Sequence, residues 1–405
     1  MGSAREASLD YIVANGGTIT NAVSSRAWPG DAAVNVSMVN WVRGAPQGPY
    51  QLIVEAQTYA VDRIPTHLQL HADVSGAASI AASSSGMVQG VGFGHEAFRS
   101  GGAAGFSLER LRGNSCIRPV ATGDDLLRGR MAIAPDYCID LRGCTTEAEA
   151  RATGGEAFEH LKQHVFPLLK ARAESGRETN DYATWLQKWW KPINPRDEFF
   201  RHVAEMDRII VCPKVSARPS FAFASTRFVP NNTVQMFGYD DDYTFGIVQS
   251  KLHWEWAKAK GNRVAERIQY SAAVWTTFPW PQEPSDEEVA AVASAARGLR
   301  RVRDALMKDN GWSLRALYQA SEVPGRHPLI DAQAALDDAV RAAYGIPADQ
   351  ETAEFLLELN KLVADDEGEG RQVQGPGLPR GLDAHDPRWT SEDCIEPPRE
   401  EGERG

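Results

Sequence analysis

The pattern of apolar and polar positions gives the N-terminal part of the chain the character of an incomplete sheet domain. Residues 4–14 predict a short helix, and Ala33–Val42 alternates apolar and small polar side chains as a half-buried strand does. Residues 51–56 predict a second strand, paired with the first across the turn at 44–49. A helix and a hairpin cannot enclose a core alone. This part is therefore expected to be the end of a larger sheet domain.

The middle of the chain mixes helical and strand periodicity. Strands are expected at residues 116–120, 137–141, 208–215, 220–229, 233–239 and 243–248. Helices are expected at residues 156–173, 182–190, 196–205 and 250–260. Asn231-Asn232 lies between two strand-like runs and indicates a turn. Such a mixture predicts an α+β domain.

Beyond Pro284 the pattern is helical. Ser285 is a good N-cap and is followed by three acids, which favours a helix at 285–308. Further helices are expected at residues 312–320, 331–344 and 351–364. The tail at 366–405, rich in Pro, Gly and acids, is predicted to be disordered, so that its removal leaves the fold intact.

The distribution of charge changes what the net value of −11 implies about partners. Residues 366–405 hold eleven acids and five bases, whereas residues 186–233 hold eight bases and four acids. Residues 248–270 hold five bases and two acids. Because attraction to phosphates depends on the local field, the negative total does not exclude a nucleic acid.

Other simple features bound the class of protein. No apolar run is long enough to cross a bilayer, and the N-terminus lacks an apolar signal core, so a cytoplasmic protein without a membrane partner is expected. The five cysteines are not in CxxC pairs, which favours reduced thiols and no metal site. His67 and His71 have helical ligand spacing but lack a third ligand nearby, and exposed histidines are the better interpretation.

Two further motifs have ordinary explanations. The run Gly90–Gly94 does not follow a strand into a helix, so a flexible loop is favoured over a cofactor loop. Asp240-Asp241-Asp242 lacks the later glutamate of a calcium loop, which favours a solvated turn.

An ordered set of segments resembles the C-terminal part of MmeI-like type II restriction-modification DNA adenine methyltransferases. The segments are Leu9–Ile19, Ala22–Ser25, Trp28–Val34, Gly86–Gly90, Gly94–Phe98, Asp241–Ser250, Thr277–Pro281, Leu336–Gly345 and Leu356–Asn360. The likeness covers residues 8–365 in the family's order. Each segment by itself is weak evidence for the family, but together and in this order the segments are specific to it.

The resemblance implies a mixed α/β and α+β fold in four parts. Residues 1–75 resemble a remnant of a class I methyltransferase sheet, 76–284 a target recognition domain, and 285–365 a C-terminal helical domain, followed by the acidic tail at 366–405. The family is implied to methylate adenine N6 with S-adenosylmethionine, often with a fused nuclease. This sequence departs from it, because it contains no Asn/Asp-Pro-Pro-aromatic motif, no Gly-rich cofactor turn after an early strand and no PD…ExK set. No catalytic or cofactor-binding residue is therefore assigned, and the isolated chain is expected to be inactive.

The resemblance also favours DNA contacts in the basic stretches. Candidates for phosphate contact are Lys188, Lys191, Arg196, Arg201, Lys214, Arg218, Arg227 and Lys251. The alternative for this set is a solvated face over a core packed with tryptophans. Glu266, Arg267 and Gln269 are candidates for base readout, because these side-chain types pair with cytosine, guanine and adenine edges. An exposed polar strand with an ion pair is an equally good interpretation.

The function expected from the sequence is recognition of double-stranded DNA for an adenine-N6 methyltransferase whose catalytic and nuclease parts lie on a separate polypeptide or are lost. The alternatives left open are a non-catalytic scaffold protein of a phage-defence system and an inactive truncated gene product.

Overall fold

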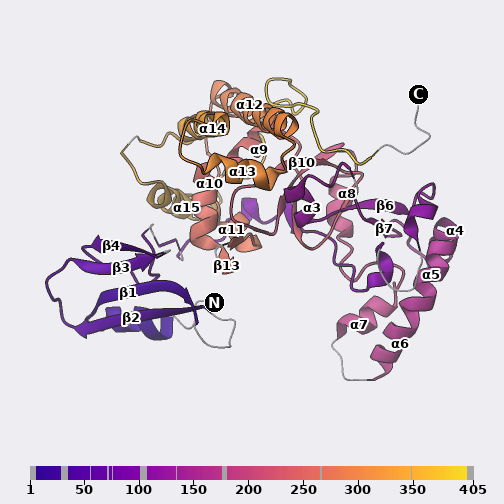
Figure 1. Cartoon of the computed structure of the whole chain (residues 1–405), viewed down its shortest axis with the longest axis horizontal. Coiled ribbons are helices and arrows are strands. Elements are labelled where there is room, and N and C mark those ends of the chain that lie inside the picture. The colour runs from indigo at the N-terminus through magenta and orange to yellow at the C-terminus, as the bar shows by residue number, and fades with distance from the viewer. Residues whose placement is uncertain are drawn as a thin grey trace. The chain divides into compact units, whose positions relative to one another are not determined.

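The computed structural model describes residues 6–28, 35–54, 56–70, 73–74, 76–100, 107–133, 135–175, 180–264, 267–347 and 349–398. Contacts divide the chain into two compact units: residues 1–77 with 351–358, and the remainder. Both helices and several small sheets are present, which confirms the predicted mixed fold class (Figure 1).

The first unit is a small sheet beside a short helical segment. Its elements are η1 (Glu6–Asp10), α2 (Tyr11–Ala14), β1 (Gly17–Ala27), β2 (Asn35–Arg43), β3 (Tyr50–Val54) and β4 (Gln57–Val61). The strand order is β2-β1-β3-β4, with β1 antiparallel to β2 and parallel to β3. The predicted pairing of β2 with β3 is wrong, because β1 lies between them. Register shifts at Ile19/Asn21 and Val23/Arg26 break the alternation of β1, which hid it in the sequence.

In the second unit, the described residues form three small sheets. Their strands are β5 (Met87–Gln89), β6 (Ile117–Ala121), β7 (Tyr137–Ile139), β8 (Arg208–Pro213), β9 (Val215–Ser216), β10 (Ala222–Ser225), β11 (Val229–Pro230), β12 (Val234–Phe237), β13 (Asn262–Val264) and β14 (Arg267–Gln269). The orders are β10-β8-β12-β5, β11-β6-β7 and β13-β14-β9. The largest sheet is antiparallel throughout and is buried along β8 and β12.

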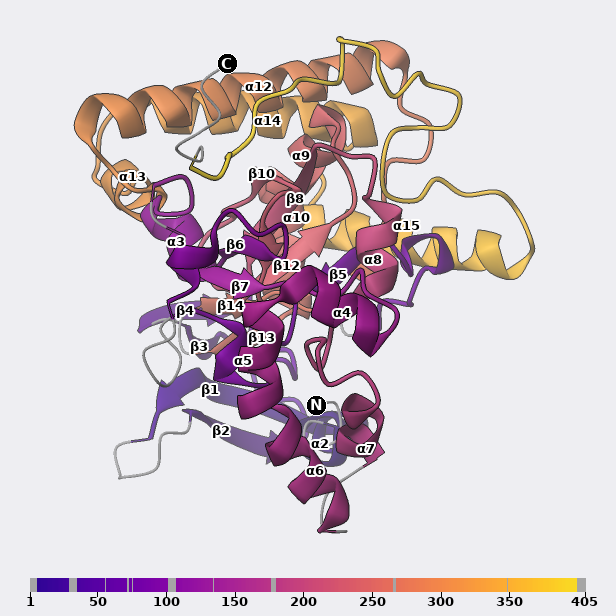
Figure 2. The ribbon, with the colours of Figure 1, turned by 90° about the vertical axis from the view of Figure 1, so that its right-hand side faces the viewer.

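Helices surround these sheets. They are α3 (Gly123–Arg128), α4 (Glu147–Gly154), α5 (Glu156–His164), α6 (Phe166–Glu174), α7 (Asn180–Leu186), α8 (Asp197–His202), α9 (Asp242–Gln249), α10 (Lys251–Lys260), α11 (Ala272–Thr277), α12 (Asp286–Asn310), α13 (Leu314–Ser321), α14 (Pro328–Tyr344) and α15 (Thr352–Gly368). The described residues also form the 3-10 turns η2 (Ala81–Ser83), η3 (Glu96–Phe98) and η4 (Leu108–Leu111). The helices expected after Pro284 are confirmed, and α12 lies along α14 in both views (Figures 1 and 2).

The prediction of a strand at 243–248 is wrong, since this segment is helix α9. All residues of α9 are buried, so the helix has no polar face from which a 3.6-residue period would be recognised. A Cβ on Gly246 would lie 2.6 Å from Val292 Cγ1, so only glycine permits this close approach of α9 to α12. The cap of α12 is as expected: Ser285 accepts from the Glu288 amide and donates its own amide to the Glu288 carboxylate at 2.8 Å.

The predicted disorder of the tail is wrong for its described residues, which end at 398. The Trp389 side chain is 1% exposed. Ile395 donates its amide to Phe223 O at 2.9 Å and accepts from Ser225 N at 3.0 Å, so the tail lies beside β10. The yellow segment in Figure 2 runs along α12. The acidic composition led to the wrong prediction, because Asp393 of the tail binds Arg208 and Arg300 of the core.

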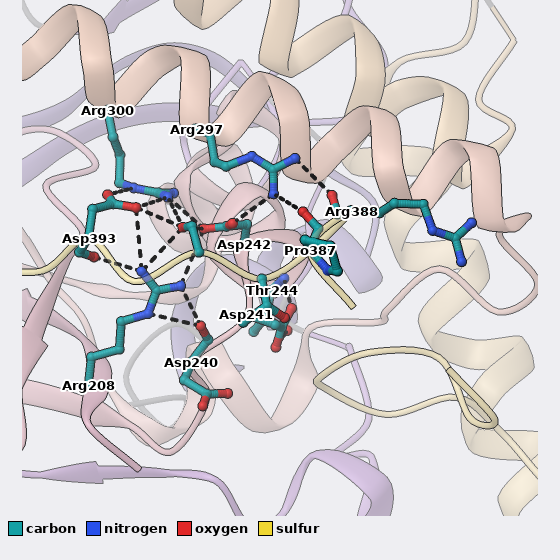
Figure 3. Close-up of polar contacts among 12 residues, drawn as sticks. Arg208, Asp240, Asp241, Asp242, Thr244, Arg297, Arg300, Pro387, Arg388 and Asp393 are labelled. Atoms are coloured by element: carbon teal, nitrogen blue, oxygen red, sulfur yellow. Dashed lines mark hydrogen bonds and ion pairs between the residues drawn. The ribbon is translucent and has the colours of Figure 1, made fainter. Parts of the chain in front are cut away.

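The three consecutive aspartates are also not a solvated turn. Asp242 is fully buried and accepts hydrogen bonds from Arg300 Nη2 at 2.5 Å, Arg297 Nη1 at 3.0 Å and Ser391 Oγ at 2.9 Å (Figure 3). Asp393 of the tail accepts from Arg300 Nε at 2.7 Å. Burial opposes ionisation of Asp393, but the Arg300 guanidinium outweighs it and holds its pKa well below the ordinary range. This buried cluster ties the tail to α9 and α12.

Candidate nucleic-acid interface

An open cavity of about 720 Å³ in the second unit gathers cationic and amide side chains. Its lining is Gln89, Arg99, Thr122, Gly123, Asp124, Leu127, Pro213, Lys214, Val215, Asn231, Asn232, Thr233, Arg267, Gln269 and Arg315. Guanidinium and ammonium groups bind phosphates, and amides and guanidiniums hydrogen-bond to base edges. The cavity therefore holds the side-chain types that a DNA-reading surface requires.

Backbone pairing fixes Lys214 at this place. The residue follows the last position of β8, and its amide donates to Thr233 O at 2.8 Å while its carbonyl accepts from Tyr270 N at 2.8 Å. The chain is thus held on both sides where it turns from β8 into β9. The half-buried side chain of Lys214 reaches the cavity from this point.

The alternation of β14 directs Arg267 and Gln269 to the same cavity. Ile268 between them is 5% exposed and belongs to the core, and side chains alternate along a strand. Arg267 and Gln269 therefore both lie on the opposite face from Ile268 and line the cavity. Arg267 is exposed. Glu266, the third residue predicted to read bases, lies outside the described residues.

The turn predicted at Asn231-Asn232 forms another wall. Asn231 Oδ1 accepts from the Thr233 amide at 3.0 Å and from its hydroxyl at 2.5 Å, and Gln89 Nε2 donates to Asn232 O at 2.6 Å. A Cβ on Gly90 would lie 2.2 Å from Asn231 O, so glycine lets the two segments touch. The turn is thereby rigid, with Asn232 exposed.

The cations of the cavity differ in their partners. Arg99 pairs with Asp136 at 2.9 Å, and Arg315 pairs with Asp124 at 3.2 Å. In the part of the chain that the structure describes, neither Lys214 nor Arg267 forms an ion pair. Their charges are therefore the most available to a phosphate or a base.

A second cavity of about 230 Å³ adjoins the first and shares Leu127, Val215, Arg267 and Arg315 with it. Arg218, predicted to contact phosphate, lines this second cavity. Its guanidinium pairs with Glu322 at the end of α13, and Nε lies 2.7 Å from the carboxylate oxygen. Arg218 is thus beside the candidate interface, with its charge already balanced.

Lys188 and Lys191 line a separate cavity of about 380 Å³ beside Trp185. Lys188 is exposed, but Lys191 is buried and its Nζ lies 3.1 Å from Asp197 Oδ2. The structure gives Lys191 a structural partner, which argues against the predicted phosphate contact. The tryptophans predicted to support the scaffold, Trp185, Trp189 and Trp190, are buried.

The other predicted phosphate contacts do not line the main cavity. Arg196 caps α8 in a left-handed conformation (φ 61°), and burial lowers the pKa of its guanidinium. Arg201 is exposed on α8, and Arg227 is exposed after β10. Lys251 begins α10 and lies 3.7 Å from Glu255. Among the described residues, none of these four lines the cavity with Lys214 and Arg267.

Sequence reasoning missed Arg99, Arg315 and Gln89. They come from segments more than a hundred residues from Arg267 or Lys214, or from the helical part that carried no expectation of DNA contact. No local motif marks them, because their shared position arises only when the chain folds.

The described residues offer neither a metal site nor a membrane span. No group of three His, Cys, Asp or Glu side chains is arranged to hold a metal ion. No helix among these residues is long and apolar enough to cross a membrane.

The cavity lies largely within a segment that a known family covers. Residues 109–282 match the MmeI target recognition domain. This confirms the resemblance noted from the sequence. Lys214, Arg267, Gln269 and Asp124 lie inside the matched segment, whereas Arg99 and Arg315 lie outside it.

Two known proteins resemble larger parts of the chain. DNA methyltransferase A of Bacillus subtilis (strain 168) is 30% identical over 228 residues, which are 54% of this chain and 24% of that protein. The Type IIL restriction-modification enzyme MmeI, solved in complex with DNA, superposes with a TM-score of 0.68 at 19% identity. That match covers 89% of this chain and 48% of MmeI. The chain thus spans a quarter to a half of the length of these two proteins, and the structural likeness is one of fold.

Proposed function

We propose that the chain recognises a specific sequence in duplex DNA for an adenine-N6 methyltransferase of a restriction-modification system. The single observation that carries the proposal is the cavity lined by Lys214, Arg267 and Gln269, within the segment that matches the MmeI target recognition domain. Lys214 supplies sequence-independent attraction to phosphates, whereas Arg267 and Gln269 supply donors and acceptors that distinguish base edges.

Methyl transfer is assigned to protein parts other than residues 1–405. The glycine-rich segment does not fit a cofactor loop, because the Val91 amide donates to Pro230 O at 2.8 Å and the Gly92 amide to Asn194 O at 3.2 Å. Val91 is fully buried, so this segment is also not the flexible loop that the sequence predicts. S-adenosylmethionine would therefore be bound by the catalytic parts, on this or another polypeptide.

Exposed features of the first unit favour the proposal that a further, catalytic domain packs against it. In the described residues the outer edge of β2 has no neighbouring strand, and Met38 and Trp41 on this strand are about half exposed. Unpaired edges and apolar side chains of this kind are usually covered in a complete protein.

The experiment that tests the proposal measures the affinity of the purified chain for a random 30-base-pair duplex as salt is raised. Binding through phosphates gives a log–log slope of about −0.9 per phosphate contacted. Affinity that does not change with salt contradicts the proposal, and a folded chain that does not bind favours the scaffold alternative. In the same preparation, calorimetry with S-adenosylmethionine is expected to show no binding, and methyl transfer to DNA is expected to be absent.

A further inference from the structure

Asp124 is an acid in a cavity that is otherwise basic. It lies in the first turn of α3 and lines the same cavity as Lys214 and Arg267. A carboxylate at this place repels the phosphates that the surrounding cations attract.

Three guanidiniums surround this carboxylate. Arg128 Nε lies 2.8 Å from Asp124 Oδ2, and Arg315 Nη2 lies 3.2 Å from Oδ1. Arg130 Nη2 lies 3.6 Å from Asp124 Oδ2, but it lies 2.5 Å from Oδ1 of the buried Asp125, which is its closer partner. The arginines come from α3, the segment after it and α13, and both views place α3 next to α13 (Figures 1 and 2). Asp124 and Arg315 both line the cavity, whereas Arg128 and Arg130 follow Asp124 closely in the chain and lie outside its lining.

All members of this cluster remain accessible to solvent. Between 43% and 53% of each of the four side chains is exposed. Exposed ion pairs are weak and break easily, whereas guanidinium binds phosphate in a forked geometry. A DNA phosphate that approaches the rim can therefore replace Asp124 as the partner of these arginines.

We propose that Asp124 limits the attraction of this surface to the DNA backbone by competing with phosphates for Arg128 and Arg315. This inference rests on the proposed function. Any duplex must displace the carboxylate, but only the preferred sequence also gains base contacts at Arg267 and Gln269. The carboxylate thus weakens specific and non-specific complexes by a similar factor, and the preference for one sequence comes from Arg267 and Gln269.

Replacement of the acid by its amide tests this account. Asp124→Asn is expected to bind a random duplex about three- to tenfold more tightly than the wild type at ~0.1 M salt, because one repulsive charge is removed from the contact surface. Its salt dependence is expected to steepen by about 0.9 for each additional phosphate bound. Thermal unfolding followed by circular dichroism checks that the exposed substitution leaves the fold intact.

Glu159→Gln is the matched control. Glu159 pairs with Arg151 at 2.6 Å, and both side chains are about half exposed, but neither lines the cavity. This variant also loses one negative charge, and it is expected to keep the wild-type affinity for duplex DNA and the wild-type salt dependence of that affinity. If it tightens binding as much as Asp124→Asn does, net charge alone explains the effect and the inference is wrong.

A double-mutant cycle with Arg315 tests the competition itself. Arg315→Ala is expected to weaken binding less than about twofold in the wild type but about three- to tenfold in the Asp124→Asn background, where this arginine is released. If Arg315→Ala weakens DNA binding equally in the two backgrounds, Asp124 does not compete with phosphates for Arg315.

The outcomes also separate this inference from the proposed function. A wild type that binds DNA while Asp124→Asn binds no more tightly overturns only the role of Asp124. If neither protein binds DNA, both are overturned. Binding by Asp124→Asn alone supports both.

Discussion

Two clusters of arginine and aspartate in this protein have opposite surroundings. Around Asp242, the arginines at 208, 297 and 300 are mostly buried and are bound by carboxylates and carbonyls (Figure 3). Around the cavity, Arg267 is exposed and Asp124 shares three half-exposed arginines. The first cluster holds the tail and helices together, whereas the second can exchange partners with a ligand. Burial, and not the number of basic residues in a segment, distinguishes an arginine that stabilises the fold from one whose charge is available to a ligand.

The largest effect is expected from removal of residues 371–405. The deletion exposes the site of the buried Trp389 and leaves Arg300 without Asp393. Loss of a large core aromatic costs about 3–5 kcal/mol, the buried Val373 is lost as well, and Arg300 loses the half-exposed Asp393. We expect chemical denaturation to show a fall of more than about 5 kcal/mol in the free energy of unfolding. A shortened chain with wild-type stability would mean that the tail is not part of the core.

Asp242→Ala is expected to have the next largest effect. It removes the buried carboxylate that Arg297 and Arg300 share and leaves them with Asp393 and backbone carbonyls as acceptors, which costs about 3–5 kcal/mol in the free energy of unfolding. Asp240→Asn is the control, because Arg208 binds the Asp240 carbonyl and this contact survives the substitution. Equal destabilisation by the two variants would show that the cluster does not depend on the Asp242 carboxylate.

The cap of α9 predicts a pH dependence of stability. Burial raises the pKa of Asp241 to about 7, although the Thr244 amide and hydroxyl donate to its carboxylate. Because the folded-state pKa lies above the unfolded value, the folded protein binds this proton more tightly between about pH 4 and 7. Stability contributed by Asp241 is therefore present at low pH and is lost as the pH rises through 7.

Asp241→Asn isolates this contribution, since asparagine also caps helices but does not titrate. At about 1.4 kcal/mol per pH unit, the wild type is expected to lose up to about 4 kcal/mol relative to the variant between pH 4 and 8. Denaturation series at several pH values measure the difference. Parallel pH profiles for the two proteins would show that Asp241 does not titrate in this range.

Lys191→Met is expected to have the smallest effect on DNA binding. Lys191 is buried against Asp197, so its loss is expected to lower stability by about 1–3 kcal/mol without changing the salt dependence of binding. Lys188→Met, an exposed neighbour in the same cavity lining, is the comparison. A salt slope that flattens by about one unit for Lys191→Met would place this lysine on the DNA.

Much of the fold could be predicted from sequence where one face of an element is apolar. The helices after Pro284 have such faces, and Ser285 marks the start of α12 by its cap. The errors lie where this rule fails: α9 is buried on every side, and β1 contains two register shifts. The prediction of a disordered tail was wrong for another reason: the partners of the tail, Arg208 and Arg300, are far away in sequence.

The candidate site was only partly predictable. Lys214, Arg267 and Gln269 were identified because they lie in basic or mixed polar stretches, and the fold places them in one cavity. Lys191 also lies in a basic stretch, but it is buried and paired with Asp197. The sequence contains no sign of that pairing. Arg315 and Asp124 could not be found, because their contact joins residues 191 positions apart.

Selection from randomised duplexes tests the central claim, that the face containing Lys214 and Arg267 reads DNA, most directly. The wild type is expected to enrich one motif. Arg267→Ala is expected to accept other bases at one position of that motif, with a loss of about 1–3 kcal/mol for the preferred sequence. Lys214→Ala is expected to keep the motif, bind all sequences more weakly and flatten the salt slope by about one unit. An unchanged motif and affinity in both variants would contradict the claim and place the reading surface elsewhere on the protein.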